Sequence, residues 1–182
     1  GIKLTYPTTV EAMEGLRDGV LLEVGFDTVA PNEPKDISSW VYDYAVDKVD
    51  IIDNRAKAVP CYDPRYTFVE KLQTVSTKFR HQQKDGTDPV AFMRHYYDIY
   101  ELLQRDDVQD FIGTEAYIKH KDNRFPNADN QIIAENQAFI LEDADTRAQY
   151  GDAYERSSSL YYEGKPTFEE ILAAIEKSID KL

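Results

Sequence analysis

The spacing of apolar residues changes near residue 62, and this change constrains the fold more than any other feature of the sequence. From residue 64 onward, apolar side chains recur at helical spacing, as in Phe68, Leu72, Val75 and Phe79. Before residue 62 they alternate with polar residues or form short runs, which is typical of strands. The pattern predicts an α+β chain, with a small mixed sheet in residues 1–62 and a mainly helical domain in residues 63–182.

The first 62 residues contain several candidate strands. Residues 2–6 alternate, and residues 20–26 form a nearly continuous apolar run that predicts a buried strand. Residues 8–16 begin like a capping box and predict a short helix. Pro31 and Pro34 predict a loop. Residues 37–44 fit either a strand or a short helix, and residues 49–52 are a weaker strand candidate.

The remaining residues predict a series of helices. Asp88 and Pro89 are a suitable N-cap and first residue for the helix that follows them, and Pro166 and Thr167 introduce the last helix. Residues 108–118 predict another helix, residues 122–130 a polar loop, and residues 132–141 and 146–154 further helical segments. A break is expected at residues 157–159, where three serines follow one another.

Composition and charge exclude several classes of protein. Hydrophobic residues make up 42% and charged residues 30% of the 182, which is ordinary globular composition. A formal net charge of −13 disfavours nucleic-acid binding over most of the surface, so an anion site must be a local basic cluster. The single cysteine excludes a disulfide framework and indicates an intracellular, cytoplasmic protein. The sequence contains no apolar run of about 20 residues, so we expect no contact with a membrane.

One stretch of the first long helix carries a basic stripe. Lys71, Thr74 and Lys78 lie at i, i+3 and i+7 and therefore share a face. Two ammonium groups on one stripe repel each other unless an anion lies between them, so the stripe is a candidate phosphate site. The alternative is a solvated face on which Lys71 pairs with nearby acids.

A second candidate lies at the start of the next helix. Arg94 and Asp98 are four residues apart, so they can pair across one helical turn. The pair would either aim Arg94 at an anion or clamp two helices together. His95, which lies between aromatic residues, is either a packed residue or a catalyst.

Glu23 is the one acidic residue in an apolar run. A buried carboxylate is costly unless it meets a metal, a cation or hydrogen-bond donors, and carboxylates at strand ends bind Mg²⁺. The alternative is that Glu23 lies at a sheet edge and reaches solvent.

The sequence motifs that contain these candidate residues follow one another in an order that resembles the motif order of a known family. The strand Leu-Leu-Glu-Val-Gly at residues 21–25 precedes Phe-Val-Glu-Lys-Leu at residues 68–72 and Arg-His-Tyr-Tyr-Asp at residues 94–98. Over residues 2–105 this order is similar to that of the nucleotidyltransferase family of the AbiEii/AbiGii abortive-infection toxins.

The resemblance implies a polymerase-β-like nucleotidyltransferase core with an appended helical domain. Such proteins use NTP and Mg²⁺ to transfer a nucleotide, in known cases to RNA, as toxins paired with an antitoxin. Glu23 would correspond to a metal-binding catalytic carboxylate, and Lys71 and Lys78 to basic residues near the phosphates. Arg94 and Asp98 would correspond to the basic–acidic pair of the last motif, with Asp98 catalytic.

The chain also departs from the family pattern. The first family motif is a Gly-Ser turn followed by Asp-x-Asp, and this sequence has no Gly-Ser dipeptide. Because the sequence also opens directly on a strand-like segment, we expect a fragment that lacks the catalytic half and is inactive alone. The alternative is a complete, non-catalytic acidic module that binds a protein partner.

Overall fold

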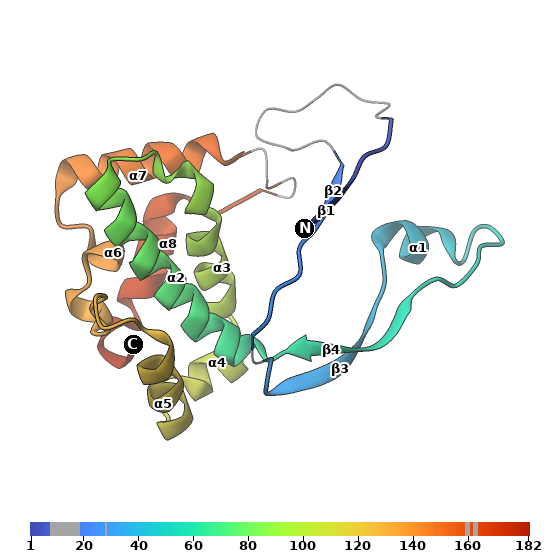
Figure 1. The fold of residues 1–182 in the computed structure, drawn as a ribbon, viewed down its shortest axis with the longest axis horizontal. Helices are drawn as coiled ribbons and strands as arrows, with labels where there is room; N and C mark the ends of the chain where they lie inside the picture. Colours follow the sequence, from blue (N-terminus) through green and yellow to red (C-terminus); the bar gives the residue numbers. More distant parts are fainter. Residues whose placement is uncertain (8–18, 28, 159–160, 162–163) are drawn as a thin grey trace.

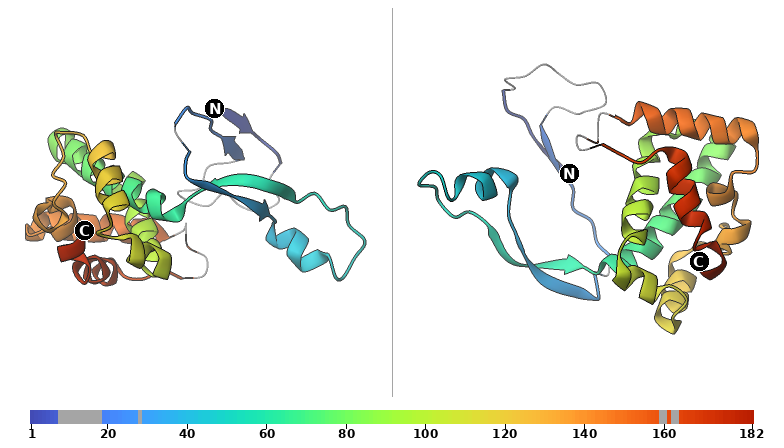
Figure 2. Two further views of the ribbon diagram at one scale, coloured as in Figure 1. Left: turned by 90° about the horizontal axis from the view of Figure 1, so that it is seen from below. Right: turned by 180° about the vertical axis from the view of Figure 1, so that it is seen from behind.

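The computed structural model describes residues 1–7, 19–27, 29–158, 161 and 164–182, and it consists of a helical bundle and two extended N-terminal hairpins (Figure 1). Strands β1 (Ile2–Leu4) and β2 (Val20–Leu22) form one antiparallel pair. Strands β3 (Asn32–Ile37) and β4 (Ala56–Tyr62) form the other, which extends away from the bundle (Figure 2). The α+β class predicted from the sequence is confirmed.

The described strands form two separate antiparallel pairs, so the expectation of one mixed sheet is wrong in this detail. The prediction of a loop at Pro31 and Pro34 is also wrong for Pro34. This residue lies within β3, opposite Pro60. Proline lacks an N–H to donate, but every strand of a two-stranded sheet has an open edge, where this loss is tolerated.

Between β3 and β4 the chain forms the short helix α1 (Trp40–Ala45). The side chain of Ser39 caps it by accepting a hydrogen bond from the N–H of Tyr42. Residues 37–44 therefore contain the end of a strand and most of a helix. Residues 49–52, a strand candidate, contain no strand, and the second strand of this hairpin begins at Ala56.

The apolar run at residues 20–26 is not a buried strand. Only Val20–Leu22 is extended into a sheet, and its side chains are exposed, with Leu22 at 52%. Phe26 is fully exposed. The physical reason is that none of the described helices forms a layer against the β1–β2 pair (Figure 1). The helix expected at residues 8–16 lies outside the described residues.

The bundle is built around α2 (Pro64–Asp85). Asp63 caps its first turn, Pro64 is its first residue, and Gly86 ends it in the left-handed conformation at φ 64°. The chain then turns through a 3₁₀ segment at Pro89–Phe92 and returns along α2 as α3 (Arg94–Leu103). The remaining helices are α4 (Asp106–Phe111), α5 (Glu115–Arg124), α6 (Gln137–Ile140), α7 (Ala144–Arg156) and α8 (Phe168–Glu176), with 3₁₀ segments at Ile133–Glu135 and Ile179–Lys181.

The helical predictions hold in outline, and the differences have local causes. The single helix expected at residues 108–118 is divided into α4 and α5 at Gly113, whose φ is 80°. Residues 132–141 form only one 3₁₀ turn and the single turn α6, and α5 extends into the loop expected at residues 122–130. The helix expected at residues 146–154 is α7 and ends at Arg156, next to the predicted break. The last helix begins as predicted, with a complete capping box between Thr167 and Glu170.

One continuous apolar core holds these helices together. α2 contributes Phe68, Leu72 and Val75, all without exposed surface, and they pack with side chains from α3, α7 and α8. The polar side of α2 also has buried contacts, since Arg80 and Thr77 both donate hydrogen bonds to the buried carboxylate of Asp129. None of the described helices is both long and apolar enough to cross a membrane.

Candidate functional site

A charged cluster joins α2 to α3 at the position where the sequence predicted an anion site. The ammonium of Lys71 lies 2.7 Å from a carboxylate oxygen of Asp98. His95 Nδ1 lies 3.4 Å from Lys71 Nζ and 3.5 Å from the same oxygen of Asp98. The cluster forms because the apolar stripes of the two helices pack together, which brings their flanking polar residues face to face.

The cluster is partly shielded from solvent. The side chain of Lys71 is 28% exposed, that of Asp98 34%, and that of His95 11%. Burial by itself raises the pKa of Asp98, but hydrogen bonds from His95 and Lys71 outweigh it and hold the pKa below its usual value. Asp98 is therefore a carboxylate at neutral pH, and it holds the ammonium of Lys71 in place.

The other predicted anion-binding residues lie on the same two helices. Thr74 and Lys78 follow Lys71 on the same face of α2, and Thr74 is half-buried whereas Lys78 is exposed. Arg94, at the start of α3, is exposed and lies one turn before Asp98. Among the ion pairs of the described residues, Asp98 pairs with Lys71 and His95, and none involves Arg94 or Lys78. The predicted pairing of Arg94 with Asp98 is therefore wrong, because Lys71 reaches that carboxylate across the helix interface.

Glu23 lies apart from this cluster. It directly follows β2 on the N-terminal hairpin and is exposed, so it does not carry the cost of burial that made it a metal candidate. Within the described ranges, no group of three or more His, Cys, Asp or Glu residues could hold a metal ion. The residues of the described structure therefore do not fit a magnesium site, and the assignment of Glu23 as a catalytic metal ligand stays a prediction.

Comparison with known protein families shows to which family the chain belongs. The family model "Nucleotidyl transferase AbiEii toxin, Type IV TA system" matches residues 1–174. The chain belongs to this family. No curated protein and no solved structure showed a significant similarity to it. The family places the protein among nucleotidyltransferase-like toxins of toxin–antitoxin systems.

This AbiEii family member has a second charged cluster that sequence reasoning missed. Glu70 of α2 accepts a hydrogen bond from the hydroxyl of Tyr62 at 2.8 Å and lies 3.3 Å from Arg124 of α5. Arg124 in turn reaches Asp27, at 3.2 Å, and His120 lies 3.4 Å from Glu70. These residues are up to 97 positions apart in the sequence, so no spacing signal could have joined them. Through Tyr62 of β4 and Asp27, which lies between β2 and β3, they connect the N-terminal segment to the bundle.

A charged cavity of about 480 Å³ lies where the β3–β4 hairpin meets the bundle. Three cations line it, but each has a carboxylate partner within it: Lys35 with Glu33, Arg65 with Asp63, and Arg105 with Asp107. Because these pairs neutralise one another, the cavity is less suited to an anion than the face between α2 and α3, where Lys78 and Arg94 lack carboxylate partners among the described residues.

Proposed function

We propose that this protein transfers a nucleotide from an NTP to an acceptor, RNA in particular, and that the α2–α3 face binds the phosphates of the NTP. Lys71 pairs with Asp98, as the alternative interpretation of the stripe expected, so its charge is partly neutralised. The observation that carries the proposal is that Lys78 of α2 and Arg94 of α3, the helix packed against it, are in no ion pair among the described residues. In a chain of net charge −13, the two helices of this face carry Lys71, Lys78 and Arg94. The family membership supports the reaction class.

The residues of the face would act on the phosphates in different ways. Lys78 and Arg94, which are in no ion pair within the described part of the chain, would meet a polyphosphate, and Arg94 can present two parallel N–H groups to it. Thr74 adds a hydroxyl donor. Asp98 contacts Lys71 and is therefore a positioning residue, which keeps one ammonium oriented along the face. Together these cations would offset the charge that develops on the phosphates during transfer.

We further propose that this chain alone does not catalyse the transfer. Mg²⁺ is the expected cofactor of the transfer reaction, in which it would supply Lewis-acid stabilisation of the phosphate charge. The described residues contain no group of three or more His, Cys, Asp or Glu side chains that could hold it. A cognate antitoxin is the proposed protein partner, in line with the toxin–antitoxin family, and the cytoplasm the proposed location.

Calorimetric titration of the chain with ATP, GTP, CTP and UTP tests the binding step. We expect binding of at least one NTP, weakened about tenfold or more when Lys71 and Lys78 are both changed to alanine, since each charged contact contributes about 1 kcal/mol or more. The matched control is Lys84→Ala with Lys119→Ala, which removes the same charge from exposed positions elsewhere. Equal loss in both double variants would contradict a site on this face.

Turnover is tested separately. The chain is incubated with labelled NTP, Mg²⁺ and RNA, and incorporation of label is measured. We expect no incorporation of label, and incorporation above background would refute the proposed inactivity.

If no NTP binds, the second candidate function is favoured, an acidic module that binds a protein partner. The apolar side chains exposed on the N-terminal hairpins support that alternative.

A further inference from the structure

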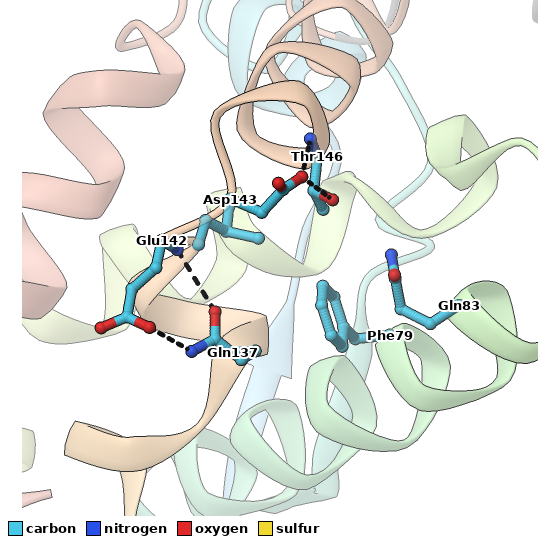
Figure 3. A pocket seen from close by; sticks show the side chains of 7 residues that line it. Phe79, Gln83, Gln137, Glu142, Asp143 and Thr146 are labelled. Atoms are coloured by element: carbon cyan, nitrogen blue, oxygen red, sulfur yellow. Dashed lines mark hydrogen bonds between the residues drawn. The ribbon is translucent and has the colours of Figure 1, made fainter.

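A cavity of about 500 Å³ lies between α2, α6 and the start of α7 (Figure 3). Phe79 and Gln83 project into it from α2, toward Asp143 and Thr146 at the beginning of α7. These two α2 residues lie on a different face of the helix from Lys71, Thr74 and Lys78, because a helix turns by about 100° per residue. The cavity is thus separate from the proposed nucleotide site.

The floor of the cavity is apolar. Phe79 is half-buried and held by the ring of Tyr150, with ring centroids 5.5 Å apart. Leu141 also lines the cavity but is only 2% exposed, so Phe79 presents most of the apolar surface. An aromatic face suits a ligand with a flat or apolar body and a polar end.

The polar side of the cavity has acceptors that no described donor occupies. Both the N–H and the hydroxyl of Thr146 donate to one oxygen of Asp143, at 2.8 and 2.7 Å. Gln137 donates to one oxygen of Glu142, at 2.9 Å, on the side of the cavity away from Gln83. Within the described structure, the second oxygen of each carboxylate and the carbonyl of Gln83 accept no hydrogen bond. The cavity therefore offers acceptors to a ligand that brings donors.

The charges around the cavity also favour a ligand that carries donors, in particular a cation. Two carboxylates line the cavity, and no lysine, arginine or histidine is among its lining residues. The positive end of the α7 dipole amounts to about half a charge, and it is outweighed by Asp143 and Asp145 in the cap and first turn. Hydrogen bonds from Thr146 lower the pKa of Asp143, so this carboxylate is charged at neutral pH.

From this combination we infer that the cavity binds the guanidinium of an arginine side chain presented by a basic protein partner. A guanidinium is planar, carries five N–H donors and is weakly hydrated, so it can lie on the Phe79 ring while it donates to Asp143 and Gln83. The net charge of −13 favours approach of a basic partner over the whole surface. The inference does not rest on nucleotide binding by the α2–α3 face.

The test uses the full chain and a pair of peptides, acetyl-Gly-Arg-Gly-amide and the same peptide with citrulline, which has the shape of arginine without its charge. Binding is followed by amide chemical shifts in NMR spectra. We expect the arginine peptide to shift the signals of Phe79, Gln83 and Thr146, and the citrulline peptide to bind about tenfold more weakly or not at all.

The variant Asp143→Asn removes the charge but keeps a good helix N-cap, so α7 remains folded. We expect it to weaken binding of the arginine peptide about tenfold. Asp145→Asn is the matched control, because it removes a charge from the same helical turn without touching the cavity. The inference is overturned if the arginine peptide does not bind, if its shifts lie elsewhere, if citrulline binds equally well, or if both variants weaken binding equally.

Discussion

The helical bundle and the N-terminal hairpins have apolar residues in similar abundance but use them differently. In the bundle, the apolar stripes of α2, α3 and α8 are buried against one another. Among the described residues, Tyr42 is the one buried apolar side chain before Phe68. Nearly all the exposed large apolar side chains lie before residue 53, the two exceptions being Ile118 and Ile132.

The difference shows that an apolar pattern predicts a local structure but not what covers it. Two short strands cannot enclose a core, and an isolated two-stranded sheet is marginally stable. Helices that lie antiparallel can bury a stripe against the next segment of the chain, as α2 and α3 do. We therefore expect the stability of the chain to reside in the bundle, and exposed apolar side chains of the hairpins to contribute little to it.

The largest expected effect tests this contrast in the apolar core. Leu72→Ala should lower the free energy of unfolding by about 3 kcal/mol, because it leaves a cavity at a position with no exposed surface. Ile52→Ala, in the hairpin at 88% exposure, should change it by less than about 0.5 kcal/mol. Urea unfolding followed by circular dichroism measures both. A similar loss in the two variants would show that the hairpins share one core with the bundle.

A smaller effect is expected from buried charge. Asp129→Asn should cost about 2 kcal/mol, because the carboxylate is fully buried and is held by Arg80 at 2.5 Å and by Thr77. Its counterpart in the hairpin is the exposed pair of Lys35 and Glu33, for which Glu33→Gln should cost less than about 0.5 kcal/mol. Thermal unfolding of both variants gives the comparison, and equal shifts in Tm would contradict it.

The smallest effect concerns Asp98 and depends on pH. Its pKa is lowered in the folded state, so its stabilising contribution is complete above about pH 3.9, the unfolded value, and is lost as pH falls through the folded pKa. Asp98→Asn should therefore cost about 1 kcal/mol at pH 7 and nothing once Asp98 is protonated. Urea unfolding across pH 2–7 measures the difference.

The hairpin again provides the control for this prediction. Hydrogen bonds from Arg55 also lower the pKa of Asp53, but this pair is solvent-exposed and therefore screened, so Asp53→Asn should change the pH dependence of global unfolding less than Asp98→Asn does. A pH-independent cost of Asp98→Asn would mean that Asp98 acts through packing rather than through its charge.

Much of the helical part could be predicted from local signals. The stripe of Phe68, Leu72 and Val75 predicted α2 and its buried face, and Thr167 marks the start of the last helix, as the structure shows. The shared face of Lys71, Thr74 and Lys78 likewise follows from periodicity alone. Pairings across distant segments could not be predicted, as Lys71 with Asp98 and Glu70 with Arg124 illustrate, because no fixed spacing relates residues on different helices.

The sequence by itself determined where the helices form, which face of each is apolar, and the family to which the chain belongs. These properties depend on neighbouring residues, whose spacing sets the side-chain direction. Only the tertiary structure decided that Lys71, rather than Arg94, holds Asp98 and that Glu23 is exposed. It also decided that an acceptor-rich cavity forms over Phe79. Such features arise where separate elements pack together, and packing depends on the shapes and charges of surfaces that are distant in the sequence.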